Sequence, residues 1–259
     1  MTRSILAAIL AFALSAPAYA DVTIKSTATG KGLGMSGTTT SVTYIKGLKM
    51  RVEATAGSKN VTSIYDVDAQ KLYILDAKKN EADLWDMSAF AQELSKSVSA
   101  DGMRTSLTPN GQTKSISGQN ADGYDIDIVV PANVAGNAVT IAMTGTSWIA
   151  KGAPGAAEYA AFYKGAGEKG WIFTDPRAAQ GAPGQAKAMA EMYKQFAEIG
   201  GMPYESQLDI KAQGEGMVAA MMARMGSMST TTITDSVETG PIADDLFVPP
   251  ADYKVKQRQ

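Results

Sequence analysis

The stretch from Val42 to Trp85 constrains the fold of this chain more than any other. It consists of short runs of β-branched and aromatic residues separated by turn residues, and this pattern is typical of an antiparallel meander of four or five strands. The run from Leu72 to Leu75 is apolar at every position. Both faces of that strand therefore need an apolar cover or an apolar ligand.

Residues 1–20 have the features of a cleaved signal peptide. Arg3 supplies a positive charge, the run from Ile5 to Leu14 is apolar, and Ala18-Tyr19-Ala20 is a small-x-small cleavage site. The apolar run is too short to span a bilayer, so we expect no transmembrane segment after leader cleavage. We predict a soluble, exported protein of the periplasm. Its residues 21–259 form a single domain in this interpretation, because no repeat, charge block or linker divides them.

The chain contains neither Cys nor His. Disulfides and thiol chemistry are therefore excluded, and so are the commonest general base and the commonest metal ligand. We expect a protein that is not an enzyme and that has no cofactor and no metal. A hydrolase that works without His remains an alternative, but it needs acidic residues from distant parts of the chain to converge in one cleft. The formal net charge of −2 argues against nucleic acid as a partner.

Strands and helices alternate after the meander. Asp86 or Ser88 is expected to cap a helix with Phe90 and Leu94 on one face, and Pro154 and Pro183 stand where two further helices would begin. This order predicts an α+β fold in which helices pack on the concave face of a large, curved antiparallel sheet. The other predicted strands cover residues 22–29, 38–45, 124–130, 139–148, 203–212 and 227–239.

Several short segments carry a resemblance to a known family. The chain resembles an uncharacterised family of exported bacterial proteins that is similar in fold to the periplasmic lipoprotein-carrier (LolA-like) superfamily. The resemblance covers most of the mature chain, and these segments carry it: Lys46 to Asp86, Lys114 to Gly118, Tyr124 to Ile126, Trp148 to Ala150, Met202 to Tyr204 and Asp245 to Pro249.

The resemblance implies an unclosed β-barrel wrapped round helices, with an apolar cavity between sheet and helices. In the carrier, that cavity holds the acyl chains of a lipoprotein in transit, and a strand arginine helps to hold the helical lid closed. Arg51 stands at the matching place in this chain. The helical block from Pro154 to Gly201 departs from the carrier pattern, which leaves the cargo and the partner contacts open.

A methionine-rich helix is the first candidate for the ligand-binding site. The flexible, polarizable Met side chain suits a lining that adapts to irregular apolar ligands. The alternative is that these side chains only fill gaps in the core. The four methionines at helical spacing are Met217, Met221, Met222 and Met225.

Four strand residues complete the predicted site. Tyr73 lies in the run that is apolar on both faces, and Trp85 and Trp148 end two strands, where an indole at a cavity mouth would meet a ligand. Packing in the core or at its rim is the alternative for both tryptophans. For Arg51, the alternative is a surface ion pair with Glu53.

Taken with the resemblance, these features predict a periplasmic carrier or binding protein for a lipophilic ligand. The ligand would be a lipid, an acyl chain or a lipoprotein, held between the curved sheet and a helical lid. Each buried methylene contributes about 0.8 kcal/mol, so an acyl chain binds usefully without a charged anchor. The alternative is an envelope protein–protein interaction or regulatory module without a small ligand, and a concave face packed solid would favour it.

Overall fold

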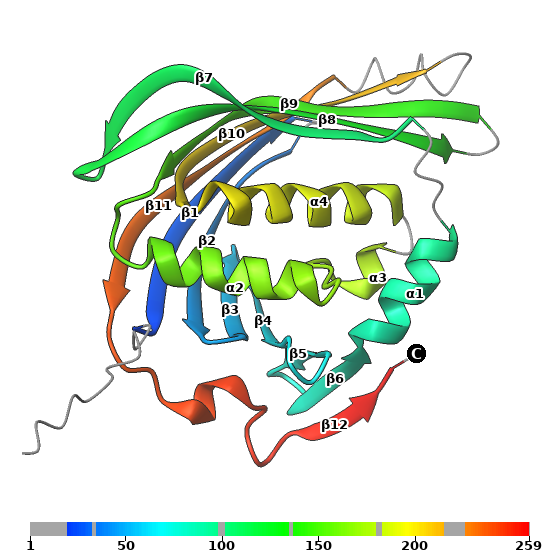
Figure 1. Cartoon of the computed structure of the whole chain (residues 1–259). Helices are drawn as coiled ribbons and strands as arrows, with labels where there is room; N and C mark the ends of the chain where they lie inside the picture. Colours follow the sequence, from blue (N-terminus) through cyan, green and yellow to red (C-terminus); the bar gives the residue numbers. More distant parts are fainter. Residues whose placement is uncertain are drawn as a thin grey trace, which may run out of the picture.

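The computed structural model describes residues 20–32, 35–97, 102–134, 137–179, 183–214 and 226–258. In these residues the strands form a 12-stranded sheet that curves round the helices (Figure 1). The strands are β1 (Val22–Gly32), β2 (Met35–Lys46), β3 (Lys49–Ala56), β4 (Lys59–Asp66), β5 (Lys71–Asp76), β6 (Glu81–Asp86), β7 (Arg104–Ile116), β8 (Gln119–Val134), β9 (Asn137–Ala150), β10 (Met202–Gly214), β11 (Met228–Thr239) and β12 (Lys254–Gln257).

The strand order is β12-β6-β5-β4-β3-β2-β1-β11-β10-β9-β8-β7. Strands β2 to β6 are consecutive neighbours, which confirms the predicted meander. All pairings are antiparallel except that of β12, which runs parallel to β6 at one edge. The sheet does not close on itself, so the predicted α+β class, with a large curved sheet in an unclosed barrel, is confirmed. The short parallel strand β12 was not predicted.

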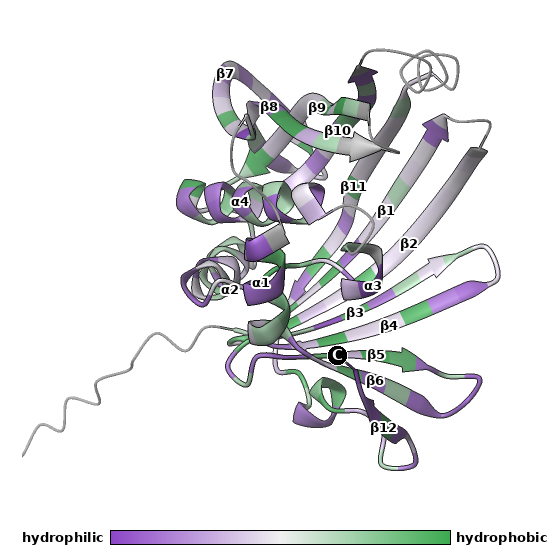
Figure 2. Cartoon of the chain, turned by 90° about the vertical axis from the view of Figure 1, so that its right-hand side faces the viewer, coloured by the Kyte–Doolittle hydropathy of each residue, from purple (hydrophilic) through white to green (hydrophobic). Residues whose placement is uncertain are grey.

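The helices lie together on the concave side of the sheet (Figure 1). Figure 2 shows them grouped at one end of the strands, while the β1–β2 and β3–β4 hairpins extend beyond them. Helix α3 lies in a stretch that the sequence predicts as a loop. The helices are α1 (Met87–Ser97), α2 (Ala156–Glu168), α3 (Pro176–Ala179) and α4 (Pro183–Ile199), with a 3-10 turn η1 (Asp244–Phe247) near the C-terminus.

The two long helices form where the apolar spacing predicts them. Helix α2 buries Tyr159, Phe162 and Tyr163, and α4 buries Met192 and Phe196, so each helix turns one apolar stripe toward the sheet. Helix α2 covers the middle of the sheet, whereas α4 packs on β7 and β8. The predicted helical cover of the concave face is thus present.

Strand β5 shows how a strand that is apolar on both faces is accommodated. Leu72 and Ile74 point into the core cluster that includes helix α2. Tyr73 and Leu75 point to the convex side, where they pack with Phe247 from η1. Both faces are therefore covered by protein, one by a helix and the other by the C-terminal segment.

Residues 240–258, which we call the C-terminal strap, run across the convex face to the far edge of the sheet (Figure 1). The ammonium group of Lys46 holds the start of the strap by donating to the Ile242 carbonyl oxygen at 2.7 Å and pairing with Asp244 at 2.9 Å. At its end the backbone amide of Arg258 donates to the Leu84 carbonyl oxygen at 2.8 Å. The strap thus connects the middle of the sheet to the β6 edge.

Candidate functional site

The middle of the concave face is filled by aromatic side chains. The rings of Tyr163 on α2 and Tyr193 on α4 stack with their centroids 4.9 Å apart, and Phe173 packs against Tyr163 at the same distance. Tyr65 on β4 packs on Phe173 from the sheet side, and burial raises the pKa of its hydroxyl to about 12. Burial likewise raises the pKa of Tyr163. These neutral, closely packed rings form a core between the sheet and the helices.

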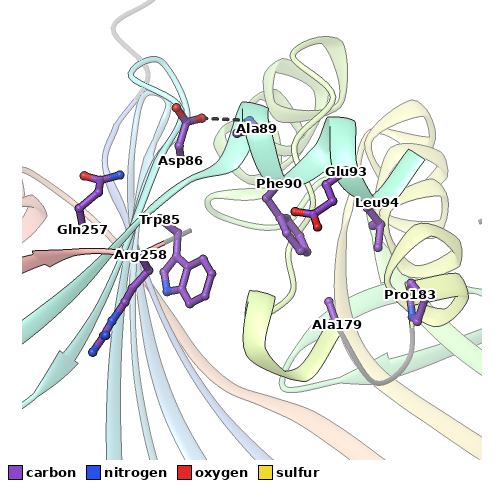
Figure 3. A pocket seen from close by; sticks show the side chains of 10 residues that line it. All are labelled: Trp85, Asp86, Ala89, Phe90, Glu93, Leu94, Ala179, Pro183, Gln257 and Arg258. Atoms are coloured by element: carbon purple, nitrogen blue, oxygen red, sulfur yellow. Dashed lines mark hydrogen bonds between the residues drawn. The ribbon is translucent and has the colours of Figure 1, made fainter. Parts of the chain in front are cut away.

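An open space lies beside α1, at the edge of the sheet. A pocket of about 460 Å³ opens between α1, the β6–β12 edge, the end of α3 at Ala179 and the start of α4 at Pro183 (Figure 3). We call it the α1 pocket. It is lined by Trp85, Asp86, Ala89, Phe90, Glu93, Leu94, Ala179, Pro183, Gln257 and Arg258.

The passage from β6 into α1 positions the aromatic part of this pocket. Trp85 stands opposite Leu72 in the strand register and points to the concave side, where it is 7% exposed. Phe90 follows on the first turns of α1, and Figure 3 shows both rings turned toward the same space. The two aromatic side chains form an apolar floor that Leu94, Ala179 and Pro183 extend.

Asp86 fixes the start of α1. Its Oδ1 atom accepts hydrogen bonds from the Ser88 and Ala89 amides at 3.0 and 3.1 Å and from the Ser88 hydroxyl at 2.8 Å. The hydrogen bond from Ala89, followed by that from the Ser88 side chain, lowers the pKa of Asp86. The N-cap predicted from the sequence is therefore present, and it places a carboxylate at the pocket rim.

The strap supplies the opposite wall. Strand β12 pairs with β6 from Lys254 to Gln257, and this pairing carries Gln257 and Arg258 to the pocket. The Arg258 guanidinium donates through Nε to Asp83 Oδ1 at 2.8 Å, and its Nη2 atom lies 2.7 Å from the same oxygen. Because β12 follows a long irregular segment, the sequence reasoning missed both residues. The only local sequence signal for strand β12 is the alternation of Val255 with the lysines on either side of it.

Among the strand residues predicted for the site, Trp85 is the one that lines the α1 pocket. Arg51 lies on the convex face, where its Nη1 atom donates to the Leu246 carbonyl oxygen at 3.0 Å and its Nε atom to Glu53 at 2.7 Å. Strand alternation therefore turns the Arg51 side chain to the strap, on the face opposite the helices. The ion pair with Glu53, named as the alternative, is present.

Tyr73 and Trp148 do not line the α1 pocket. Tyr73 packs with the strap on the convex side. Trp148 stands next to Glu205 in the register and has the Lys114 ammonium 5.1 Å from its ring centroid, which is a cation–π contact. The structure does not bring these side chains together with Trp85. Of the predicted site residues, Met217, Met221, Met222 and Met225 lie outside the described residues.

The described residues hold no group of three or more Asp, Glu, His or Cys side chains that could bind a metal ion. The carboxylates that line the α1 pocket, Asp86 and Glu93, both come from α1 and the residue before it rather than from distant parts of the chain. Among the described helices, none combines the length and the apolar content needed to cross a membrane.

Comparisons with known proteins give distant structural matches. No protein-family model matches the sequence, and no curated protein matches it. Among solved structures, an uncharacterized conserved protein from Thermus thermophilus is 9% identical with a TM-score of 0.41, and the match covers 93% of this chain and 91% of that chain. A DUF1329 family protein from Desulfovibrio piger is 8% identical with a TM-score of 0.29, over 90% of this chain and 91% of that one.

A domain named for outer membrane lipoprotein sorting, from Vibrio parahaemolyticus, also matches. It is 9% identical, has a TM-score of 0.32, and the match covers 88% of this chain and 89% of that chain. Because the identities and TM-scores of these three matches are low, they carry no argument about this chain.

Proposed function

We propose that this protein is a non-catalytic carrier or binding protein of the periplasm for a lipophilic ligand. The ligand class is that of a lipid, an acyl chain or the acylated end of a lipoprotein. In this proposal residues 1–20 are removed on export, and residues 21–259 act as a single domain. The observation that carries the proposal is the α1 pocket, because it joins an aromatic and aliphatic floor to a polar rim.

The size and lining of the pocket suit such a ligand. Small-molecule sites commonly have volumes of about 300–1,000 Å³ and are lined mostly by apolar side chains with a few polar groups. The α1 pocket has about 460 Å³, with Trp85, Phe90 and Leu94 as its apolar side. Burial of roughly ten methylenes contributes about 8 kcal/mol before the cost of association is subtracted. A single acyl chain is therefore a sufficient ligand.

Helix α1 is the element that would cover the bound ligand. It is attached to the core mainly through Met87 in its first turn and Leu94 in its third, which are 1% and 5% exposed. The residues between them that line the pocket are less buried. A helix held at two points can shift to admit a ligand while the aromatic core under α2 stays intact.

Two tryptophan substitutions on α1, one in the pocket lining and one outside it, test the proposal. Ala89 lines the pocket and is exposed, so Ala89→Trp fills the mouth without displacing core side chains. Gln92→Trp is the matched control, since Gln92 is exposed on the same helix but does not line the pocket. We expect Ala89→Trp to weaken binding of a fluorescent fatty acid about tenfold or more, and Gln92→Trp to leave it unchanged.

Native mass spectrometry of the protein purified from the periplasm gives an independent measurement. We expect a bound lipophile that is lost in Ala89→Trp. A ligand-free spectrum together with no uptake of any fluorescent lipophile, anionic, cationic or uncharged, would refute the proposal.

A second candidate function is an envelope protein–protein interaction or regulatory module. One observation favours it: the middle of the concave face is filled by the aromatic side chains of Tyr163, Phe173 and Tyr193. Under this alternative, the protein binds one envelope protein with the same affinity whether or not lipid has been stripped from it. Measurement of that affinity with and without delipidation separates the two candidates.

A further inference from the structure

We propose that the α1 pocket selects positively charged amphiphiles, meaning ligands that join an apolar chain to a protonated amine or a quaternary ammonium group. This inference rests on the proposed lipophile-binding function and specifies the class of ligand. It follows from the charges at the rim of the pocket and from the aromatic side chains beneath them.

Two carboxylates at α1 face the pocket. Asp86 and Glu93 are seven positions apart, and Phe90 lies between them, so helical spacing places all three on one side of the helix. Figure 3 shows the Glu93 carboxylate on the same side as the Phe90 ring. Among the described residues no ion pair engages Glu93, and the hydrogen bonds to Asp86 all use Oδ1, which leaves Oδ2 for a ligand.

The basic side chain that lines the α1 pocket, that of Arg258, is already neutralised by an ion pair. Arg258 is bound to Asp83, and Figure 3 shows its guanidinium pointing away from Trp85 and Phe90. Arg177 lies 3.8 Å from the other oxygen of Asp83 and is paired with Asp175 at 2.6 Å. These two arginines and two aspartates balance one another, so the carboxylates at α1 set the sign of the potential at the mouth.

Aromatic side chains lie directly under this negative rim. A cation near the face of a Trp or Phe ring is attracted by the electrons of the ring, and the attraction grows when the site is shielded from water. The α1 pocket thus offers Trp85 and Phe90 to the substituents of an ammonium group and Glu93 to its charge. Among the described residues that line the pocket, an anionic head group meets two carboxylates and no unpaired cation, which disfavours fatty acids relative to alkyl amines.

Three probes with the same alkyl chain test the selection: dodecyltrimethylammonium, dodecanoate and the uncharged dodecyl ether of hexaethylene glycol. Each is titrated below its micelle concentration by competition with a fluorescent lipophile. Since a charge pair near a protein surface is worth about 1 kcal/mol or more, we expect the cationic probe to bind at least about fivefold more tightly than the anionic one. The ratio is expected to fall as salt is added, because the charges at the mouth are screened.

Two substitutions locate the effect. Glu93→Gln keeps the shape of the side chain and removes its charge, so we expect the ratio of cationic to anionic affinity to fall by about fivefold while the uncharged probe binds as before. Glu198→Gln on α4 is the control, since Glu198 is exposed and does not line the α1 pocket. It leaves all three affinities unchanged.

The outcomes separate this inference from the function it rests on. Equal binding of all three probes, or tighter binding of dodecanoate, overturns the charge selection and leaves the lipophile-binding proposal in place. Binding of none of the probes overturns both. A preference for the cationic probe that survives in Glu93→Gln and in the double variant Asp86→Asn/Glu93→Gln also overturns it, because the carboxylates would then not be its source.

Discussion

Replacement of Phe247 by Ala tests whether the C-terminal strap is part of the folded core or only lies against it. Phe247 is 2% exposed and packs with Ile64, Leu75 and Ala82 on the convex face of the sheet. The convex face of an isolated curved sheet would be exposed to solvent. The burial of this ring indicates instead a second core, smaller than the one under the helices.

The magnitude follows from the burial. Truncation of a buried Phe to Ala costs about 3–5 kcal/mol, made up of lost transfer free energy and the cavity left behind. The strap is a single layer and can relax toward the sheet, so we place the loss of unfolding free energy at about 3 kcal/mol, the lower end of that range. Since domains are stable by about 5–15 kcal/mol, this loss is a large fraction of the total.

Urea unfolding followed by circular dichroism and by tryptophan fluorescence measures the loss. The expected result is a lower midpoint with an unchanged slope for Phe247→Ala. Val248→Ala is the control, because Val248 is 50% exposed and its truncation is expected to change stability by less than about 0.5 kcal/mol. A loss below about 1 kcal/mol for Phe247→Ala would show that the strap adds little to the fold, which would refute the reasoning.

Two further predictions concern the sheet and the start of α1. A Cβ atom at Gly145 on β9 would overlap the Gln207 carbonyl oxygen of the neighbouring strand. Gly145→Ala is therefore expected to lower the free energy of unfolding, measured in urea, by about 1–3 kcal/mol. An unchanged free energy of unfolding would contradict the close approach of the two strands. Asp86→Ala removes the N-cap and is expected to cost about 1 kcal/mol at neutral pH. The fold lowers the pKa of Asp86 from 3.8, so this stability is present above the unfolded value and is lost as the pH falls through the folded one. The difference between Asp86→Ala and wild type should therefore shrink below about pH 3.8, and a difference that persisted there would show that the charge of Asp86 is not its source.

The secondary structure of the long elements could be predicted because it depends on local pattern. The meander from Val42 to Trp85, the helix from Pro183 and the alternating strand around Tyr124 each carry a complete apolar period in their own residues. The N-cap at Asp86 is equally local, since it needs only a carboxylate followed by a helix.

Strand β12 could not be predicted in the same way. It has four residues and pairs parallel to β6, from which it is separated by most of the chain. Such a strand is too short to carry a recognisable pattern of apolar and polar residues. Which strand it pairs with depends on the path of the strap. The wall of the α1 pocket formed by Gln257 and Arg258 was missed for this reason.

The faces of the sheet on which Arg51, Tyr73 and Trp148 lie show a different limit of prediction from the sequence. Strand alternation predicts which neighbours in sequence share a face, but it does not predict which face turns inward when both carry apolar residues. On β5 that choice depends on two covers, α2 on one side and Phe247 on the other, and both come from distant parts of the chain.

The long strands, helices α1, α2 and α4, the N-cap and the need for two apolar covers on β5 follow from the sequence, because each of these depends on residues close together in the chain. That the strap supplies the second cover, and that a pocket lies between α1 and β12, follows only from the tertiary structure. Those outcomes depend on how large side chains from separate elements fill the concave face, and the volume that remains after packing is a property of the whole arrangement.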